Sequence, residues 1–185
     1  IVFAPLVSER RVGESFVLVA ASNRGLPVSF TVSGPATLGG LDNKTLTVNG
    51  VGIVEVTALQ TGNANYLAAP SVVRSFVSVK NTASITLSSM THTYNGQAKL
   101  ATAVTNPVGR NVVFSYEPVS PWWCLGLCSG EATAPINVGS YNVTATVNDP
   151  SYSGNQTGLL VISEASQAIT FASVQLNQLV NSFVD

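Results

Sequence analysis

Hydrophobic and polar residues alternate with a period of two along much of the chain. The clearest run covers residues 141–147, where Tyr141, Val143, Ala145 and Val147 share one face and the intervening residues are Asn or Thr. Period-two alternation among β-branched and aromatic residues is typical of half-buried β-strands. No segment keeps a helical period of hydrophobic residues, so we predict an all-β protein.

Turn-forming pairs such as Asn49-Gly50, Asn95-Gly96 and Asp149-Pro150 separate the alternating runs. Short strands with turn signals roughly every 8 to 12 residues indicate antiparallel β-sandwiches. The expected strands of the first half lie near residues 1–4, 15–21, 27–33, 45–48, 52–60 and 71–79. Those of the second half lie near residues 84–88, 99–105, 111–117, 139–148 and 157–163.

The chain also repeats itself at a spacing of 84 residues. Ile1-Val2-Phe3 corresponds to Ile85-Thr86-Leu87, and 84 positions later to Ile169-Thr170-Phe171. Self-similarity at a fixed period indicates a tandem array. We therefore predict two tandem sandwiches, at residues 1–82 and 83–166, followed by residues 167–185 as the first strand of a further repeat or an intersubunit strand.

Internal positions keep the same phase. Phe30 corresponds to Phe114 at a spacing of 84 residues, and Val56 corresponds to Val143 at a spacing of 87. A one-residue slip would turn the inner face of a strand outward, so we expect both pairs to be buried at equivalent positions. The connections near residues 80–83 and 164–168 are short and lack Pro and Gly, which predicts a stiff, extended array.

Charge and composition narrow the possible partners. Hydrophobic residues make up 45% of the 185 residues and charged residues only 9%, with a net charge of −1. Typical domains have about 25% charged residues. The basic residues are scattered apart from Arg10-Arg11, whereas binding to a phosphate backbone requires clustered positive charge. No apolar run approaches the roughly 20 residues of a membrane span, so we expect no nucleic acid and no membrane insertion.

The second half carries a set of motifs in a characteristic order. They are Tyr94-Asn95-Gly96-Gln97-Ala98-Lys99, Pro135-Ile136-Asn137-Val138-Gly139-Ser140-Tyr141, and Tyr152-Ser153-Gly154. This pattern resembles the MBG domain, a bacterial immunoglobulin-like repeat of large secreted and surface proteins. The first half, with Gly25-Leu26-Pro27 and Asn63-Ala64-Asn65-Tyr66, is similar to related bacterial Ig-like repeats. The resemblance implies two tandem Ig-like sandwiches that act as a spacer or adhesion stalk without catalytic residues.

One segment departs from the MBG pattern. Residues 117–130 form an inserted loop that contains both tryptophans and both cysteines of the chain, Trp122, Trp123, Cys124 and Cys128. The cysteines are expected to form a disulfide, with free thiols or a metal site as the alternatives. The tryptophans, with Leu125 and Leu127, either pack against their own sheet or form a contact surface for a protein or a glycan.

Candidate chemistry is otherwise sparse. The single histidine, His92, has no partners for a nucleophilic triad, and the nine acidic residues suggest neither a glycosidase pair nor a calcium loop. We therefore predict no enzymatic activity, no metal and no cofactor. Three Asn-x-Ser/Thr triplets, at Asn43, Asn142 and Asn155, mark possible glycosylation sites.

These observations predict a structural module of a bacterial extracellular stalk, adhesin or fibre. Its expected partners are adjacent repeats of the chain or neighbouring subunits. The alternative is a glycan- or protein-binding module that uses the inserted loop. The tail could be a truncated third repeat, or it could add a strand to a neighbouring molecule with Ile169, Phe171 and Phe183 as anchors. Tyr66 and Tyr152 are expected to cover one end of each sandwich with their rings buried.

Overall fold

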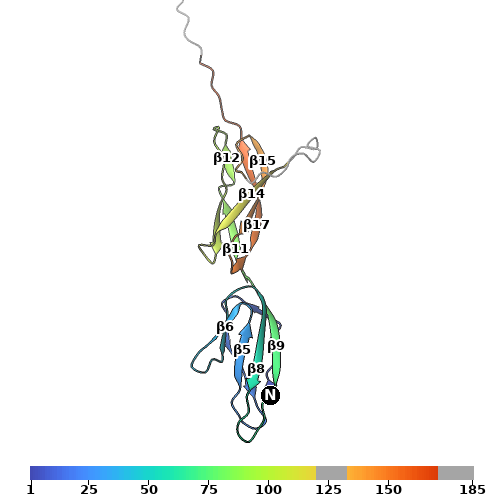
Figure 1. The fold of residues 1–185 in the computed structure, drawn as a ribbon. Coiled ribbons are helices and arrows are strands. Elements are labelled where there is room, and N and C mark those ends of the chain that lie inside the picture. Colours follow the sequence, from blue (N-terminus) through green and yellow to red (C-terminus); the bar gives the residue numbers. More distant parts are fainter. Residues whose placement is uncertain (120–132, 171–185) are drawn as a thin grey trace, which may run out of the picture.

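The computed structural model describes residues 1–119 and 133–170 of the chain. These residues form two all-β units that lie end to end (Figure 1). Unit 1 contains β1 to β9, unit 2 contains β11 to β17, and the short strand β10 lies at the joint between them. The predicted all-β class with tandem β-sandwiches is therefore confirmed.

Unit 1 is a sandwich of a four-stranded sheet and a second layer. The four-stranded sheet has the order β2-β9-β8-β5, and the second layer consists of the sheet β3-β7-β6 and the pair β1-β4. The strands are β1 (Val2–Phe3), β2 (Glu9–Arg11), β3 (Ser15–Val17), β4 (Ala20–Ala21), β5 (Ser29–Ser33), β6 (Ala36–Gly39), β7 (Thr45–Val48), β8 (Gly52–Gln60) and β9 (Ala69–Val79).

Unit 2 repeats the four-stranded sheet and the opposing strand pair, but its described residues form no counterpart of the sheet β3-β7-β6. Its four-stranded sheet has the order β12-β17-β15-β14, and β11 pairs with β13 in the opposite layer. The strands of unit 2 are β11 (Ser84–Ser88), β12 (Thr91–Thr93), β13 (Thr102–Asn106), β14 (Val112–Pro118), β15 (Gly139–Val147), β16 (Tyr152–Ser153) and β17 (Asn155–Ser163). Strand β10 (Asn81–Thr82), at the joint, precedes them.

The register of the two large sheets confirms the predicted equivalence. Phe30 lies opposite Ala58 in unit 1, and Phe114 lies opposite Ala145 in unit 2. In both units the first strand of the large sheet runs parallel to the last, β2 with β9 and β12 with β17. Gly52 and Gly139 open the equivalent strands β8 and β15, and both have positive φ angles, 147° and 152°, which glycine adopts readily.

Burial follows the predicted alternation, with one exception. Val56 and Val143 are fully buried and Phe30 is 8% exposed, but Phe114 is only half-buried. The prediction for Phe114 was wrong because Tyr116, 3% exposed, supplies the large buried ring of β14. Phe114 instead packs against two smaller core clusters of unit 2 that it links, whereas unit 1 has one continuous core.

Some strands were not predicted. The strands β2, β6, β10, β12 and β16 are absent from the predicted set, and the expected strand at 15–21 is divided into β3 and β4. Strand β2 consists of Glu9, Arg10 and Arg11, so it lacks the apolar alternation on which the prediction depended. Its hydrogen bonds to β9 form because the chain crosses from one layer to the other at this point.

Parts of the predictions fall outside the described residues. The inserted loop with Trp122, Trp123, Cys124, Leu125, Leu127 and Cys128 lies there, as do Phe171 and Phe183 of the tail. Ile169 is described, lies outside any strand and is 82% exposed.

Candidate functional site

Catalytic and metal-binding clusters are not found in the described ranges 1–119 and 133–170. No group of three or more His, Cys, Asp or Glu side chains in those ranges could hold a metal ion. His92 instead makes a hydrogen bond between its Nε2 atom and the Ser89 carbonyl oxygen, 2.8 Å away, beside the turn that joins β11 to β12. Within these described ranges, no helix is long and apolar enough to cross a membrane.

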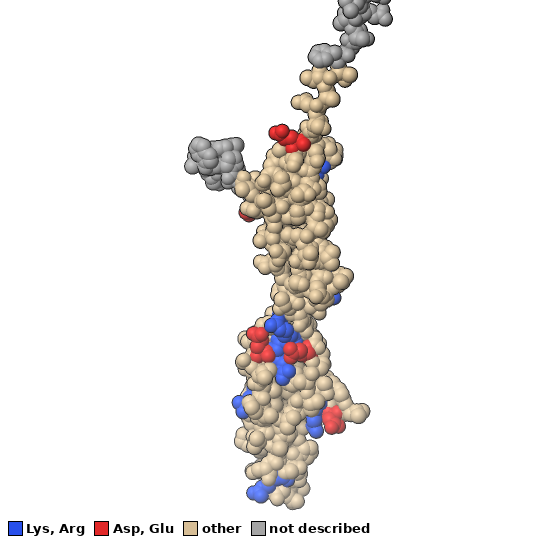
Figure 2. Space-filling view, turned by 180° about the vertical axis from the view of Figure 1, so that it is seen from behind, with Lys and Arg blue, Asp and Glu red and all other residues tan. Residues whose placement is uncertain are grey.

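Some of the charged residues, which are scattered in the sequence, lie near one another at the joint between the units. Figure 2 shows acidic and basic side chains close together at the narrow waist of the molecule. Unit 1 contributes the charges of β2 and the residues around it, and unit 2 contributes a basic and an acidic residue on facing loops. They are Glu9, Arg10 and Arg11 of β2, with Glu14, Lys80, Arg110 and Asp149.

On the side of unit 1, arginines support the end of β9. The Arg11 guanidinium donates a hydrogen bond of 2.6 Å to the Lys80 carbonyl oxygen. Arg10 pairs with Glu14 at 3.2 Å, and its guanidinium lies 3.8 Å from the centroid of the Phe16 ring. The bond from Arg11 holds the chain where it leaves unit 1, and the Arg10 contacts lie within unit 1.

Two consecutive side chains then cross the joint. The Lys80 amine donates to the Asp149 carbonyl oxygen at 2.7 Å. The Asn81 amide nitrogen Nδ2 donates to the Val12 carbonyl at 2.8 Å and to the Ser151 carbonyl at 3.4 Å. Asn81 therefore bonds to both units with a single side chain, and this restricts their relative rotation.

The main chain reinforces these side-chain contacts. The backbone N–H of Asn81 donates to Ser151 O, and that of Ala83 donates to Ser153 O, both at 2.8 Å. Strands β10 and β16 pair in parallel over these residues. The connection of residues 80–83 is therefore part of unit 2's hydrogen-bonded surface, and the predicted stiffness of the array stays a prediction.

The carbonyl groups that accept these bonds belong to a tight turn of unit 2 that begins at Asp149. The Asp149 side-chain oxygen Oδ1 accepts hydrogen bonds from the backbone N–H groups of Ser151 and Tyr152, at 2.8 and 3.1 Å. Arg110 pairs with Asp149 at 3.2 Å, and its guanidinium lies 4.5 Å from the Tyr152 ring centroid. The N–H of Ser151, followed by Arg110, holds the pKa of the Asp149 carboxyl below its usual value against the opposing effect of burial.

Unit 1 has the same kind of side-chain-capped turn, with an arginine over a tyrosine ring, at its far end. Asn63 Oδ1 accepts hydrogen bonds from the N–H groups of Asn65 and Tyr66, each at 2.9 Å, and the Arg24 guanidinium lies 5.5 Å from the Tyr66 ring centroid. Arg24 and Tyr66 each lie 86 positions before their counterparts Arg110 and Tyr152. Tyr66 is 46% exposed, so the expectation of a buried ring at this position was wrong; the Arg24 guanidinium lies over the ring.

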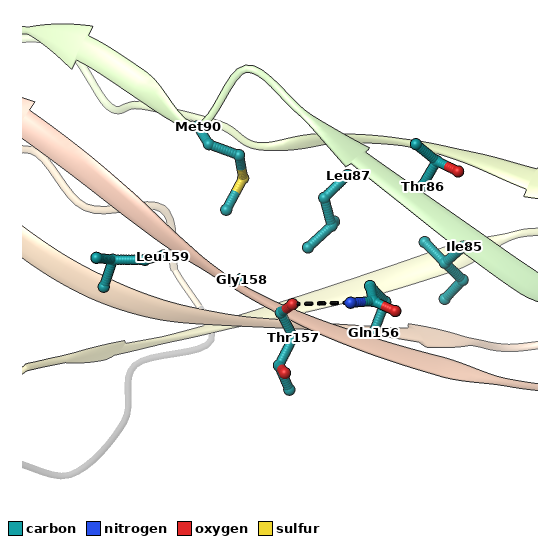
Figure 3. Close-up of a pocket in the computed structure, with 8 residues that line it drawn as sticks. All are labelled: Ile85, Thr86, Leu87, Met90, Gln156, Thr157, Gly158 and Leu159. Carbon is teal, nitrogen blue, oxygen red and sulfur yellow. Dashed lines mark hydrogen bonds between the residues drawn. The ribbon is translucent and has the colours of Figure 1, made fainter.

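Unit 2 also has a shallow groove (Figure 3). It has a volume of about 360 Å³ and lies between β11 and β17, lined by Ile85, Thr86, Leu87, Met90, Gln156, Thr157, Gly158 and Leu159. Gly158 stands opposite Val143, where Arg74 stands opposite Val56 in unit 1. Arg74 donates to the Phe3 carbonyl at 3.5 Å. In unit 2 the side chains of Leu87 and Met90 instead approach Gly158, where a Cβ atom would lie 2.9 Å from each.

None of the residues that line the groove is charged, and its one internal hydrogen bond joins Gln156 Nε2 to the neighbouring Thr157 carbonyl. The lining therefore holds no carboxyl, amine, imidazole or thiol group.

Sequence reasoning did not identify the residues of the joint. It treated residues 80–83 only as a short connection, and it treated Arg110 and Asp149 as isolated charges. The equal spacing of the two Arg–Tyr pairs was a usable signal. The candidate glycosylation residues Asn43, Asn142 and Asn155 are all exposed, and their modification remains a prediction.

Comparison with known proteins supports part of the family resemblance. Residues 83–166 match the family model of the MBG domain, so the second half contains an MBG-type domain. No curated protein matches the chain.

Among solved structures, the chain is similar to the one titled "Crystal structure of Drosophila N-cadherin EC1-4", with 15% identity and a TM-score of 0.31. The match covers 86% of this chain and 47% of the cadherin chain. A likeness this remote carries no argument about function.

Proposed function

We propose that this chain is a non-catalytic structural repeat module of a bacterial extracellular stalk, adhesin or fibre. In this role the two units form a stiff section that holds other parts of the assembly at a distance. The proposal rests above all on the joint, where Lys80 and Asn81 connect the units through hydrogen bonds.

The construction of the joint suits a spacer. A flexible linker leaves two domains free to rotate, whereas a connection that is hydrogen-bonded on both sides restricts that rotation. The amide of Asn81 must satisfy acceptors on both units at once, and Lys80 must reach a carbonyl of the turn at Asp149. Each relative orientation of the units that breaks these bonds leaves partly buried polar groups unpaired, which is unfavourable.

The MBG-type domain at residues 83–166 also supports a repeat module, since the resemblance implies domains that recur in secreted and surface proteins. The low content of charged residues, 9%, and the strand-rich surface agree with a component that forms extended arrays.

The test is the relative orientation of the units in solution. Residual dipolar couplings measured on the whole chain should fit one alignment tensor for both units, as for a rigid body. The double variant Lys80→Met/Asn81→Ala should require two separate tensors, while the amide spectra of both units stay folded.

The matched control is Lys44→Met/Asn142→Ala, which removes one lysine and one asparagine that lie away from the joint and are exposed. It should keep the single tensor. Independent alignment of the units in the unmodified chain would disprove the proposed role.

A further inference from the structure

The turn at Asn63, at the far end of unit 1, resembles the turn at Asp149 of unit 2, which accepts hydrogen bonds from Lys80 and Asn81. In unit 2, the carbonyls of Asp149 and Ser151 accept Lys80 and Asn81 from the preceding unit. In unit 1, the equivalent residues are Asn63 and Asn65, which belong to a turn with the same side-chain bonds.

The two turns differ in their exposure to solvent. Asp149, Ser151 and Tyr152 are half-buried, whereas Asn63, Asn65 and Tyr66 are all exposed. In the described part of the chain, the carbonyl of Asn65 accepts no hydrogen bond, and that of Asn63 accepts only the N–H of Tyr66, at 3.4 Å. Unit 1 thus presents a preformed but uncovered set of acceptors, next to Leu67, which is 94% exposed.

We infer that this turn is a docking surface for the end of another β-sandwich unit, specifically one whose last strand is followed by an amine and an amide side chain. The inference rests on the proposed structural role. Lys80 and Asn81 directly follow β9, so they define the chemistry of such an end. A basic donor and an amide donor would bind the carbonyls of Asn63 and Asn65 as Lys80 and Asn81 bind those of Asp149 and Ser151.

The end of unit 2 does not fit this description. Strand β17 ends at Ser163, as β9 ends at Val79, and the residues that follow are Glu164 and Ala165. Glutamate carries no donor when ionised, and alanine has no polar side chain. A second copy of this chain therefore cannot dock head to tail through the same bonds.

The predicted contact is limited to the turn. In unit 2 the chain of Ala83 passes close to Gly154, because a side chain at Gly154 would meet the Ala83 carbonyl oxygen. Two residues after Tyr66 the corresponding residue is Ala68, whose methyl group prevents an identical approach. The inference therefore includes no strand pairing of the kind that β10 makes with β16.

The test uses a chain with an added first unit. Residues 1–84 are placed directly before Ile1 of the full chain, which keeps the spacing of 84 residues and brings a second Lys80-Asn81 pair to the turn. We expect the amide resonances of Asn65, Tyr66 and Leu67 to shift and the added unit to share the alignment tensor of unit 1. Lys80→Met/Asn81→Ala in the added copy alone should abolish both effects.

A second chain, with residues 83–168 before Ile1, presents Glu164 and Ala165 to the turn at the same spacing and should show neither effect. If this second chain showed the same amide shifts and shared tensor as the first, the docking would not depend on the Lys80 amine and the Asn81 amide, and the inferred donors would be wrong. If the added residues 1–84 aligned independently while the native joint stayed rigid, the inferred docking surface would be disproved and the proposed function would stand. Loss of a shared tensor at the native joint as well would instead refute the proposed function.

Discussion

The α-carbon of Gly154 lies against the backbone of Ala83, which directly follows β10, with no room for a side chain. A Cβ atom at Gly154 would lie 2.0 Å from the Ala83 carbonyl oxygen, far inside van der Waals contact. Because the obstacle is backbone, it cannot move aside as a side chain could. Gly154→Ala should therefore push β10 away from β16 and release the joint.

We expect Gly154→Ala to lose the single alignment tensor of the two units while the spectrum of unit 1 is unchanged. The unfolding free energy of unit 1 should change by less than about 0.5 kcal/mol, as for substitutions remote from a domain. Ser153→Ala, at the exposed neighbouring position, is the control and should keep the joint intact. Rigid alignment in the Gly154→Ala protein would show that β10–β16 pairing is dispensable.

The charge of Asp149 should make the joint sensitive to acid. The folded-state pKa lies below the usual value, so ionised Asp149 stabilises its turn above the unfolded-state pKa of about 3.9, and this contribution is lost as pH falls through the folded-state pKa. A titration from pH 6 to pH 2, followed by the amide shifts of Ser151 and Tyr152, should report the transition.

Asp149→Asn provides the comparison, because unit 1 makes the same turn with Asn63. The variant should retain the bonds from Ser151 and Tyr152 but lose the ion pair with Arg110 and the acid transition. If the amide shifts of Asp149→Asn moved with pH as in the native protein, another group would be responsible.

The hydroxyl of Tyr116 should be important for unit 2. It accepts a hydrogen bond of 3.0 Å from the buried N–H of Ala101. Tyr116→Phe leaves that N–H without a partner, which should cost about 1–3 kcal/mol of unfolding free energy. Denaturant unfolding of the whole chain measures it. Tyr94→Phe, at a position 40% exposed, should change stability by less than about 0.5 kcal/mol.

Two adjacent leucines of β17 offer a direct test of the layer assignment. Leu160 is fully buried and Leu159 is 50% exposed. Leu160→Ala should destabilise unit 2 by about 2–5 kcal/mol through lost burial and the cavity left behind. Leu159→Ala removes the same atoms from the surface and should cost under about 1 kcal/mol. Equal effects would mean that β17 does not face the core as described.

The outline of the fold was predictable from the sequence because its signals are local. Alternation at residues 141–147 fixes which side chains of β15 face inward, and Val143 and Ala145 are fully buried as a result. The spacings of 84 and 87 residues identified equivalent positions in the two large sheets, since a packed inner face tolerates no slip of register. Strands without this alternation, such as β2 and β12, gave no such signal.

The joint was decided by the tertiary structure alone. Lys80 and Asn81 follow a strand in the sequence, and nothing local indicates that their acceptors are residues 149 and 151, about 70 positions away. Those acceptors are main-chain carbonyls, which carry no sequence signature, and their direction depends on how the turn at Asp149 is folded. The sequence by itself determined two like units in tandem. Only their three-dimensional contact determined that the units are held together, because a hydrogen bond requires position and direction that residue type does not specify.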